Sequence, residues 1–169
     1  GLSHIIMVIN RQFSSYTIVV LLVLSSSLFA QTSTNELNAF WIEAERQVRE
    51  GDFEAYSNSF HADAILVNGL SKNSIPIKEA LDDWEKGFED TRQSQMEASV
   101  EFHFSETLLG TSSAYQKGIF HYTSEYIGQS PVSVFIHFEV LLTKSNGIWK
   151  ILMEYQKDYA TKEDWNRLE

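Results

Sequence analysis

The hydrophobic residues of this chain change their spacing at Gln95, and that change limits the folds open to it. From Met96 to Phe104 every second residue is apolar, which is typical of a strand with one buried face. Three more strand-like segments follow, separated by short turns that contain Gly, over residues 114–126, 132–144 and 148–158. Four long strands joined by tight turns predict an antiparallel meander.

The residues before this point have helical spacing instead. Apolar side chains recur three and four positions apart in three segments, each predicting a helix with one buried face, over residues 35–50, 53–60 and 77–90. A brief apolar run at 64–68 predicts an early strand between the second and third helices.

Short polar and glycine motifs predict where these helices begin and end. Ser33 and Glu36 have the spacing of a capping box, so we expect the first helix to start there. Gly51 should end that helix, because glycine readily adopts the left-handed conformation found at helix ends. Asp52 should cap the second helix.

Helices in the first half and antiparallel strands in the second predict an α+β fold. We expect a cone-shaped, curved antiparallel sheet wrapped around three N-terminal helices. The length of 169 residues suits one domain, which we predict to span residues 31–169.

The first thirty residues have the features of a secretory signal peptide. Arg11 precedes the apolar run Tyr16–Leu24, and small residues ending at Ala30 follow. The apolar run is shorter than the ~20 residues that a membrane-spanning helix needs. We therefore predict that residues 1–30 are removed, that the protein is periplasmic or secreted, and that the mature chain does not contact a membrane. An uncleaved N-terminal anchor is the alternative, because Leu28 is large for its place near the cleavage site.

Charge and cysteine content exclude several classes of function. The chain has 13 Lys and Arg residues against 23 Asp and Glu residues, a net charge of -10. Nucleic-acid binding needs clustered Lys and Arg, so we expect no nucleic-acid partner. The lack of Cys excludes disulfides, zinc–thiolate sites and thiol nucleophiles. No phosphate-binding loop, Ser-His-Asp set or metal-binding motif is present, and we expect no cofactor.

Several short motifs resemble the nuclear transport factor 2-like superfamily. They are Gly51-Asp52, Tyr56, Asp63-Ala64 and the closing run Asn146-Gly147-Ile148-Trp149-Lys150-Ile151. The likeness covers about residues 35–158 and looks closest to the SnoaL-like and ketosteroid-isomerase-like branch of small secreted domains. The resemblance implies the cone-shaped fold and a small hydrophobic organic molecule as ligand. It does not name a reaction, because folds of this kind carry many functions.

The resemblance also allows the isomerase residues to be compared one by one. The position of the catalytic base falls on Asn68, whose amide cannot take a proton from carbon. The position of the oxyanion-binding tyrosine falls on Ala44, and that of the second oxyanion donor falls near Glu139. Two of the three roles are therefore missing, and we do not expect steroid isomerisation.

The same resemblance places a ligand pocket between the second and third helices and the inner face of the sheet. Its apolar wall is expected to consist of Tyr56, Phe60, Trp84 and Phe88. Its polar groups are expected to be Asn68, His137, Glu139 and Glu154. The alternation of apolar and polar residues along the predicted strands argues against these polar groups facing the helices. A sheet covered by helices should turn its apolar side chains toward them. The two arguments conflict, and the sequence does not decide between them.

Three histidines, His103, His121 and His137, lie on different predicted strands, each between apolar neighbours. By alternation each histidine points away from those neighbours. The pattern fits a solvated or subunit-facing sheet surface, a polar pocket wall, or a metal site.

We predict from these features an exported domain that binds a small molecule in a hydrophobic conical pocket. The alternative is a lyase, cyclase or hydrolase that acts on a hydrophobic organic substrate, with His137 or Glu139 as acid or base. Apolar residues on more than one face of the predicted strands favour a homodimer through the sheet.

Overall fold

The computed structural model describes residues 28–168. The chain divides into two compact units, residues 1–37 and residues 38–169. Most of the predicted signal peptide, residues 1–30, lies outside the described residues, so its cleavage stays a prediction. Within the described part of the chain, no helix combines the length and the apolar character needed to cross a membrane.

Residues 28–37, the described part of the first unit, are all helical. The hydroxyl of Thr34 donates a hydrogen bond of 2.8 Å to the carbonyl of Ala30, one helical turn earlier. Ser33 therefore lies inside a helix rather than at its start. The capping box predicted at Ser33 and Glu36 is wrong, because the helix begins before it.

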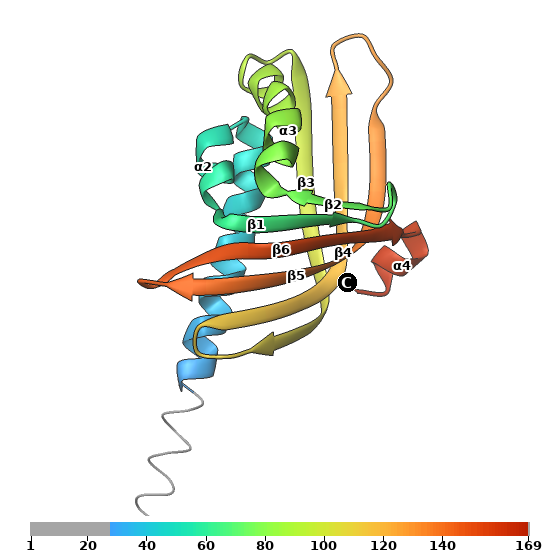
Figure 1. The fold of residues 1–169 in the computed structure, drawn as a ribbon. Helices are drawn as coiled ribbons and strands as arrows, with labels where there is room; N and C mark the ends of the chain where they lie inside the picture. Colours follow the sequence, from blue (N-terminus) through green and yellow to red (C-terminus); the bar gives the residue numbers. More distant parts are fainter. Residues whose placement is uncertain (1–27, 169) are drawn as a thin grey trace, which may run out of the picture. The chain divides into compact units, whose positions relative to one another are not determined.

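Three of the helical segments of the second unit precede its long strands (Figure 1). They are residues 38–50, α2 (Phe53–Asn58) and α3 (Ile77–Arg92). The chain turns between the first two at Gly51, whose φ of +69° is a conformation that glycine adopts readily. Asp52 then caps α2, because its carboxylate accepts a hydrogen bond of 3.2 Å from the backbone N–H of Ala55. Both of these predicted helix ends are confirmed.

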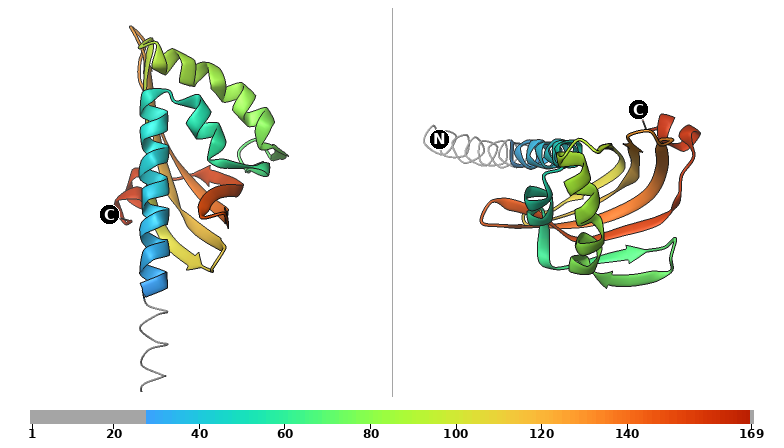
Figure 2. Two further views of the ribbon diagram at one scale, coloured as in Figure 1. Left: turned by 90° about the vertical axis from the view of Figure 1, so that its left-hand side faces the viewer. Right: turned by 90° about the horizontal axis from the view of Figure 1, so that it is seen from above.

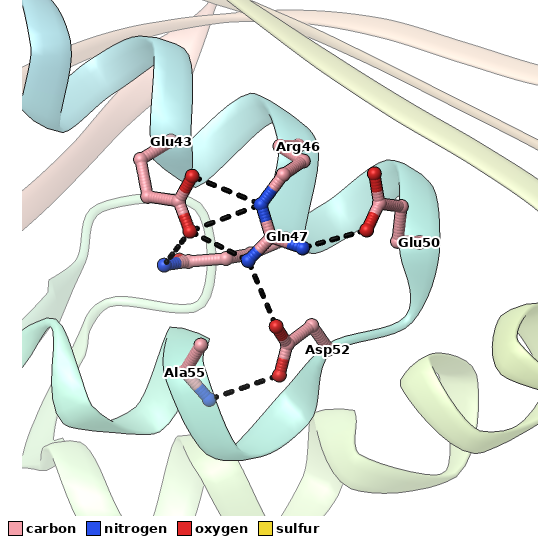
Figure 3. Close-up of polar contacts among 6 residues, drawn as sticks. All are labelled: Glu43, Arg46, Gln47, Glu50, Asp52 and Ala55. Atoms are coloured by element: carbon pink, nitrogen blue, oxygen red, sulfur yellow. Dashed lines mark hydrogen bonds and ion pairs between the residues drawn. The ribbon is translucent and has the colours of Figure 1, made fainter.

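Arg46 ties the helix of residues 38–50 to the start of α2 (Figure 3). Its guanidinium donates hydrogen bonds to Glu43 and Glu50 on its own helix, and to Asp52 at 2.8 Å. The Arg46 hydrogen bonds lower the pKa of Glu43 and of Asp52. All four side chains are partly exposed, so the cluster sets the angle of the corner more than it adds stability.

Six strands form one sheet in the order β2-β1-β6-β5-β4-β3 (Figure 1). Their bounds are β1 Phe60–Asn68, β2 Asn73–Pro76, β3 Met96–Leu109, β4 Ser113–Tyr126, β5 Val132–Ser145 and β6 Ile148–Tyr159. Neighbouring strands are antiparallel except β1 and β6, which are parallel. The predicted four-strand meander is confirmed as β3 to β6. The sequence did not predict β2, because its four residues are largely exposed and have no apolar alternation.

The sheet is curved and open, with α3 on its concave side (Figure 2). Phe138, Val140 and Leu142 of β5 form the centre of the core and are at most 1% exposed. The short helix α4 (Lys162–Asn166) lies on the convex side, where Trp165 stacks on the ring of His103 with centroids 3.7 Å apart. The predicted α+β fold, a curved antiparallel sheet around N-terminal helices, is confirmed.

Candidate functional site

A cavity of about 650 Å³ lies between the concave face of the sheet and the helices of the second unit. Ligand-binding pockets for small organic molecules span roughly 300–1,000 Å³, so the volume suits such a ligand. Most of the lining side chains are aromatic or aliphatic, among them Trp41, Tyr56, Trp84, Phe88, Val100, Phe102, Phe120, Tyr122, Ile136 and Ile151.

Three of the aromatic residues predicted for the pocket line this cavity. The rings of Tyr56 and Phe88 pack with centroids 4.8 Å apart, and Trp84 lies 6.4 Å from Tyr56. They meet because α2 and α3 each carry aromatic residues at helical spacing, which places them on one side of each helix. Phe60 was also predicted for the wall, but its side chain is buried and does not line the cavity. Its ring centroid lies 5.5 Å from that of Tyr56.

An irregularity in β6 brings polar side chains to the same face as its apolar ones. Leu142 pairs with Ile151 and Val140 pairs with Glu154, so β6 holds one more residue than β5 between these two pairs. Ile151 and Glu154 therefore both face the cavity, although strict alternation would put them on opposite faces. Gln156 lies on the cavity side as well, two residues further along the strand.

Glu154 is a buried carboxyl group, with 8% of its surface exposed. The side-chain amide of Gln156 donates a hydrogen bond of 2.8 Å to its Oε1 atom. Burial raises the pKa of Glu154, and the hydrogen bond from Gln156 offsets this only in part. No Lys, Arg or His of the described residues forms an ion pair with it. Burial, together with the charge of Glu154, also raises the pKa of Tyr56, whose hydroxyl therefore stays protonated.

The buried Glu154 predicts a dependence of stability on pH that Glu154→Gln should remove. Because its pKa is raised in the folded state, its ionisation destabilises the fold as the pH rises from about 4.3 through the folded pKa. We expect Glu154→Gln to have a higher Tm than the parent at neutral pH, and this advantage to disappear near pH 4. Thermal unfolding at a series of pH values measures both effects.

Glu139→Gln is the matched control for that experiment and should act in the opposite direction. The hydrogen bond from Lys157 lowers the pKa of Glu139, so its ionised form stabilises the fold above about pH 4.3. This variant should lower the Tm at neutral pH and have no effect in acid. A Tm for Glu154→Gln that is below the parent's at neutral pH would contradict the assignment of Glu154 as an unbalanced buried acid.

His137 and Glu139 lie outside the cavity, against the expectation that they line it. Their neighbour Ile136 turns inward, so alternation directs both polar side chains to the convex face. Glu139 accepts a hydrogen bond of 2.8 Å from Lys157, and His137 lies 3.7 Å from a carboxylate oxygen of Asp164 in α4. The hydrophobic effect decides which side chains of β5 point inward, because its apolar residues are buried against the helices.

Asn68 is also absent from the cavity wall. It ends β1, and its side-chain oxygen accepts a hydrogen bond of 3.0 Å from the backbone N–H of Ser71. Its role in the fold is to close the turn toward β2. Ala44, which the isomerase comparison placed at the tyrosine position, does line the cavity but offers no polar group.

The three histidines share the convex face of the sheet. His103 and His137 both lie directly across from Ile119 in the strand register, and His121 stacks on Phe135 with centroids 4.1 Å apart. Trp165 of α4 covers this surface. Within the described residues, no group of three or more His, Asp or Glu side chains is arranged to hold a metal ion.

Several lining residues were not among the predicted pocket residues. Trp41 comes from the helix of residues 38–50, and Val100, Phe102, Phe120 and Tyr122 come from β3 and β4. The alternation of β3 could have identified two of them, because Met96, Ala98, Val100 and Phe102 form its apolar face. Trp41 gave no such signal, since a tryptophan on a helix stripe is usually an ordinary core residue.

Comparisons with known proteins place the fold but not the activity. No protein-family model matches the sequence, and no curated protein matches it. A conserved protein from Planctomyces limnophilus matches in structure with a TM-score of 0.64 and 13% identity, over 74% of this chain and 94% of that one. An NTF-2 like protein of unknown function from Shewanella oneidensis has a TM-score of 0.56 and 17% identity, over 73% of this chain and 97% of that one.

A ketosteroid isomerase-like protein from Erwinia carotovora atroseptica matches with a TM-score of 0.53 and 14% identity. The match covers 72% of this chain and 92% of that one. The TM-scores establish a shared fold, whereas identities this low leave the function open. The fold predicted from the sequence is confirmed: this chain is built as the nuclear transport factor 2-like proteins are.

Proposed function

We propose that the protein binds a small, mainly apolar organic molecule in the cavity enclosed by the sheet and the helices. The observation that carries this proposal is a cavity of about 650 Å³ with a largely aromatic and aliphatic lining, in which the half-buried Gln156 is hydrogen-bonded to the buried Glu154. A mostly apolar pocket with a few convergent polar groups is the usual form of a small-molecule site.

The electrostatics of the cavity disfavour an anionic ligand. Among the described residues that line the cavity, Lys86 is the only cationic one, and its side chain is 79% exposed. Its ammonium group is bound to Asp90 at 2.9 Å. The chain also has a net charge of -10, which opposes the approach of anions.

An enzyme remains the second candidate, and its acid or base differs from the one that the sequence suggested. His137 and Glu139 are outside the cavity, whereas Glu154 lies in its wall with a raised pKa. A carboxyl group whose pKa is raised toward neutrality suits proton transfer. A lyase, cyclase or hydrolase of this fold would use Glu154, with Tyr56 as a hydrogen-bond donor beside it.

The location, assembly and finer relationships of the protein are parts of the same proposal. We take it to be exported to the periplasm or secreted after removal of residues 1–30, and to resemble the SnoaL-like branch most.

We take it to form a homodimer through the convex face of its sheet. Sedimentation of the purified protein at micromolar concentration tests the dimer, and only monomer would contradict it.

Filling the cavity tests the binding proposal directly. The uncharged fluorescent probe N-phenylnaphthylamine should brighten on entering the cavity of the parent protein. Ala98 faces the cavity from β3, so the ring of Ala98→Tyr would occupy the space. We expect at least about tenfold weaker binding of the probe by this variant, equivalent to 1.4 kcal/mol.

Glu97→Tyr is the matched control, since the neighbouring residue Glu97 is exposed on the other face. This variant should bind the probe as the parent does. Equal binding by the parent and Ala98→Tyr would contradict the assigned site. No binding by the parent would contradict the proposed function.

A further inference from the structure

Two carboxylates are buried among the described residues, and only one of them has a balancing cation. Asp90 accepts hydrogen bonds from Lys86 and from Tyr126, at 2.9 and 2.8 Å. Glu154 accepts one hydrogen bond, from the neutral amide of Gln156. An ionised carboxylate has about four acceptor sites, so most of those of Glu154 have no protein partner among the described residues.

We infer that the cavity binds an apolar amine, whose ammonium group pairs with Glu154 while its hydrocarbon part lies against the aromatic wall. The inference rests on the proposed function and adds the charge and chemical class of the ligand. Glu154 lies in the cavity wall itself, so a bound molecule reaches its carboxyl group without any rearrangement of the fold.

A cationic ligand supplies what the protein lacks at this position. Burying a charge is costly unless that charge is paired and hydrogen-bonded. An ammonium group brings both the opposite charge and N–H donors, and charge-assisted hydrogen bonds are stronger than neutral ones. A neutral ligand brings neither the opposite charge nor a charged donor, so it would gain little more from a carboxyl group than from an amide.

The aromatic wall suits an ammonium group as well as a hydrocarbon. Tyr56 lines the same cavity as Glu154, and its ring packs against Phe88 and Trp84. A cation within about 6 Å of such a ring is attracted by its electron-rich face, most strongly where water is excluded. The same cavity therefore offers both a carboxyl group and aromatic rings to a bound ligand.

Other titratable groups in the cavity wall give the experiment its controls. They are Asp83, Lys86 and the tyrosines Tyr56, Tyr122, Tyr126 and Tyr159. Asp83 is the only other carboxylate among them, and it is exposed on α3. An amine preference that came from the general acidity of the protein would depend on Asp83 or on surface carboxylates rather than on Glu154.

Three probes with one carbon skeleton separate charge from hydrophobicity. Phenylbutylamine, phenylbutanol and phenylbutyric acid compete with N-phenylnaphthylamine for the purified protein. We expect the amine to bind at least about tenfold more tightly than the alcohol, and the acid to bind most weakly. Glu154→Gln should abolish the preference for the amine and change the affinity for the alcohol less than about threefold. Glu139→Gln, which removes a carboxylate outside the cavity, should keep the preference.

The pH dependence gives a second, independent readout. Pairing with an ammonium group requires the ionised form of Glu154, so the affinity for the amine should fall as the pH is lowered through the folded pKa of Glu154, which burial raises above about 4.3. The affinity of the alcohol should not change over this range. An alcohol that binds as well as the amine, or an amine preference that survives in Glu154→Gln, would overturn the inference and leave the proposed function standing. If the fluorescent probe itself does not bind, the proposed function fails as well.

Discussion

Gly118→Ala should destabilise the domain by about 3 kcal/mol, although it adds only one methyl group. Gly118 lies in β4 opposite Phe104 of β3, where the pairing between the two strands shifts by one residue. A Cβ atom at Gly118 would overlap the carbonyl oxygen of His103 and lie 2.9 Å from the Cα of Phe104. Both obstacles are backbone atoms, so neither can move aside by changing a rotamer. Urea unfolding followed by circular dichroism measures the loss.

Gly87→Ala is the matched control, since it makes the same chemical change in α3. A Cβ atom there would lie 3.6 Å from the terminal methyl of Met96, an ordinary contact. Alanine also favours a helix over glycine by roughly 0.5–1 kcal/mol. This variant should therefore be as stable as the parent or slightly more so. If Gly118→Ala lost less than about 1 kcal/mol, β3 would have to move freely away from β4, contrary to the close approach described.

Trp41→Ala should cost about 4 kcal/mol of stability and enlarge the cavity that Trp41 lines. The indole is 6% exposed, and its ring centroid lies 4.6 Å from that of Phe102 and 5.2 Å from that of Phe104. Its N–H donates a hydrogen bond of 2.7 Å to the side-chain oxygen of Gln116, which is itself buried. Truncation therefore removes packing and leaves a buried acceptor without its donor.

Trp41→Phe separates these two contributions, because it keeps an aromatic ring and removes the N–H group. We expect a loss of about 1–2 kcal/mol from the unpaired Gln116 oxygen. In the Gln116→Leu background the same change should cost less, and a double-mutant cycle on urea unfolding measures the difference. Equal costs in both backgrounds would mean that the hydrogen bond contributes nothing to stability.

The candidate site shows where sequence reasoning reached its limit. The resemblance placed Tyr56, Trp84 and Phe88 on the cavity wall, and helical spacing, which directs each aromatic stripe to one face, agrees with that position. His137 and Glu139 were placed there by analogy, and alternation on β5 turns them away. For the side chains of β5, alternation was therefore a better guide than the match to another protein, whereas Glu154 of β6, placed by the same match, does line the cavity.

Local pattern in the sequence determined the order and type of nearly every element of this protein. Hydrophobic spacing separates helices from strands before any tertiary contact is known, and the corner at Gly51 and Asp52 follows from backbone and side-chain chemistry alone. The tertiary structure decided which polar groups share the cavity. One extra residue in β6 between its pairings with Leu142 and Val140 turns Glu154 inward. Such an irregularity arises from the fit between two strands, and the spacing of residues within one strand does not record it.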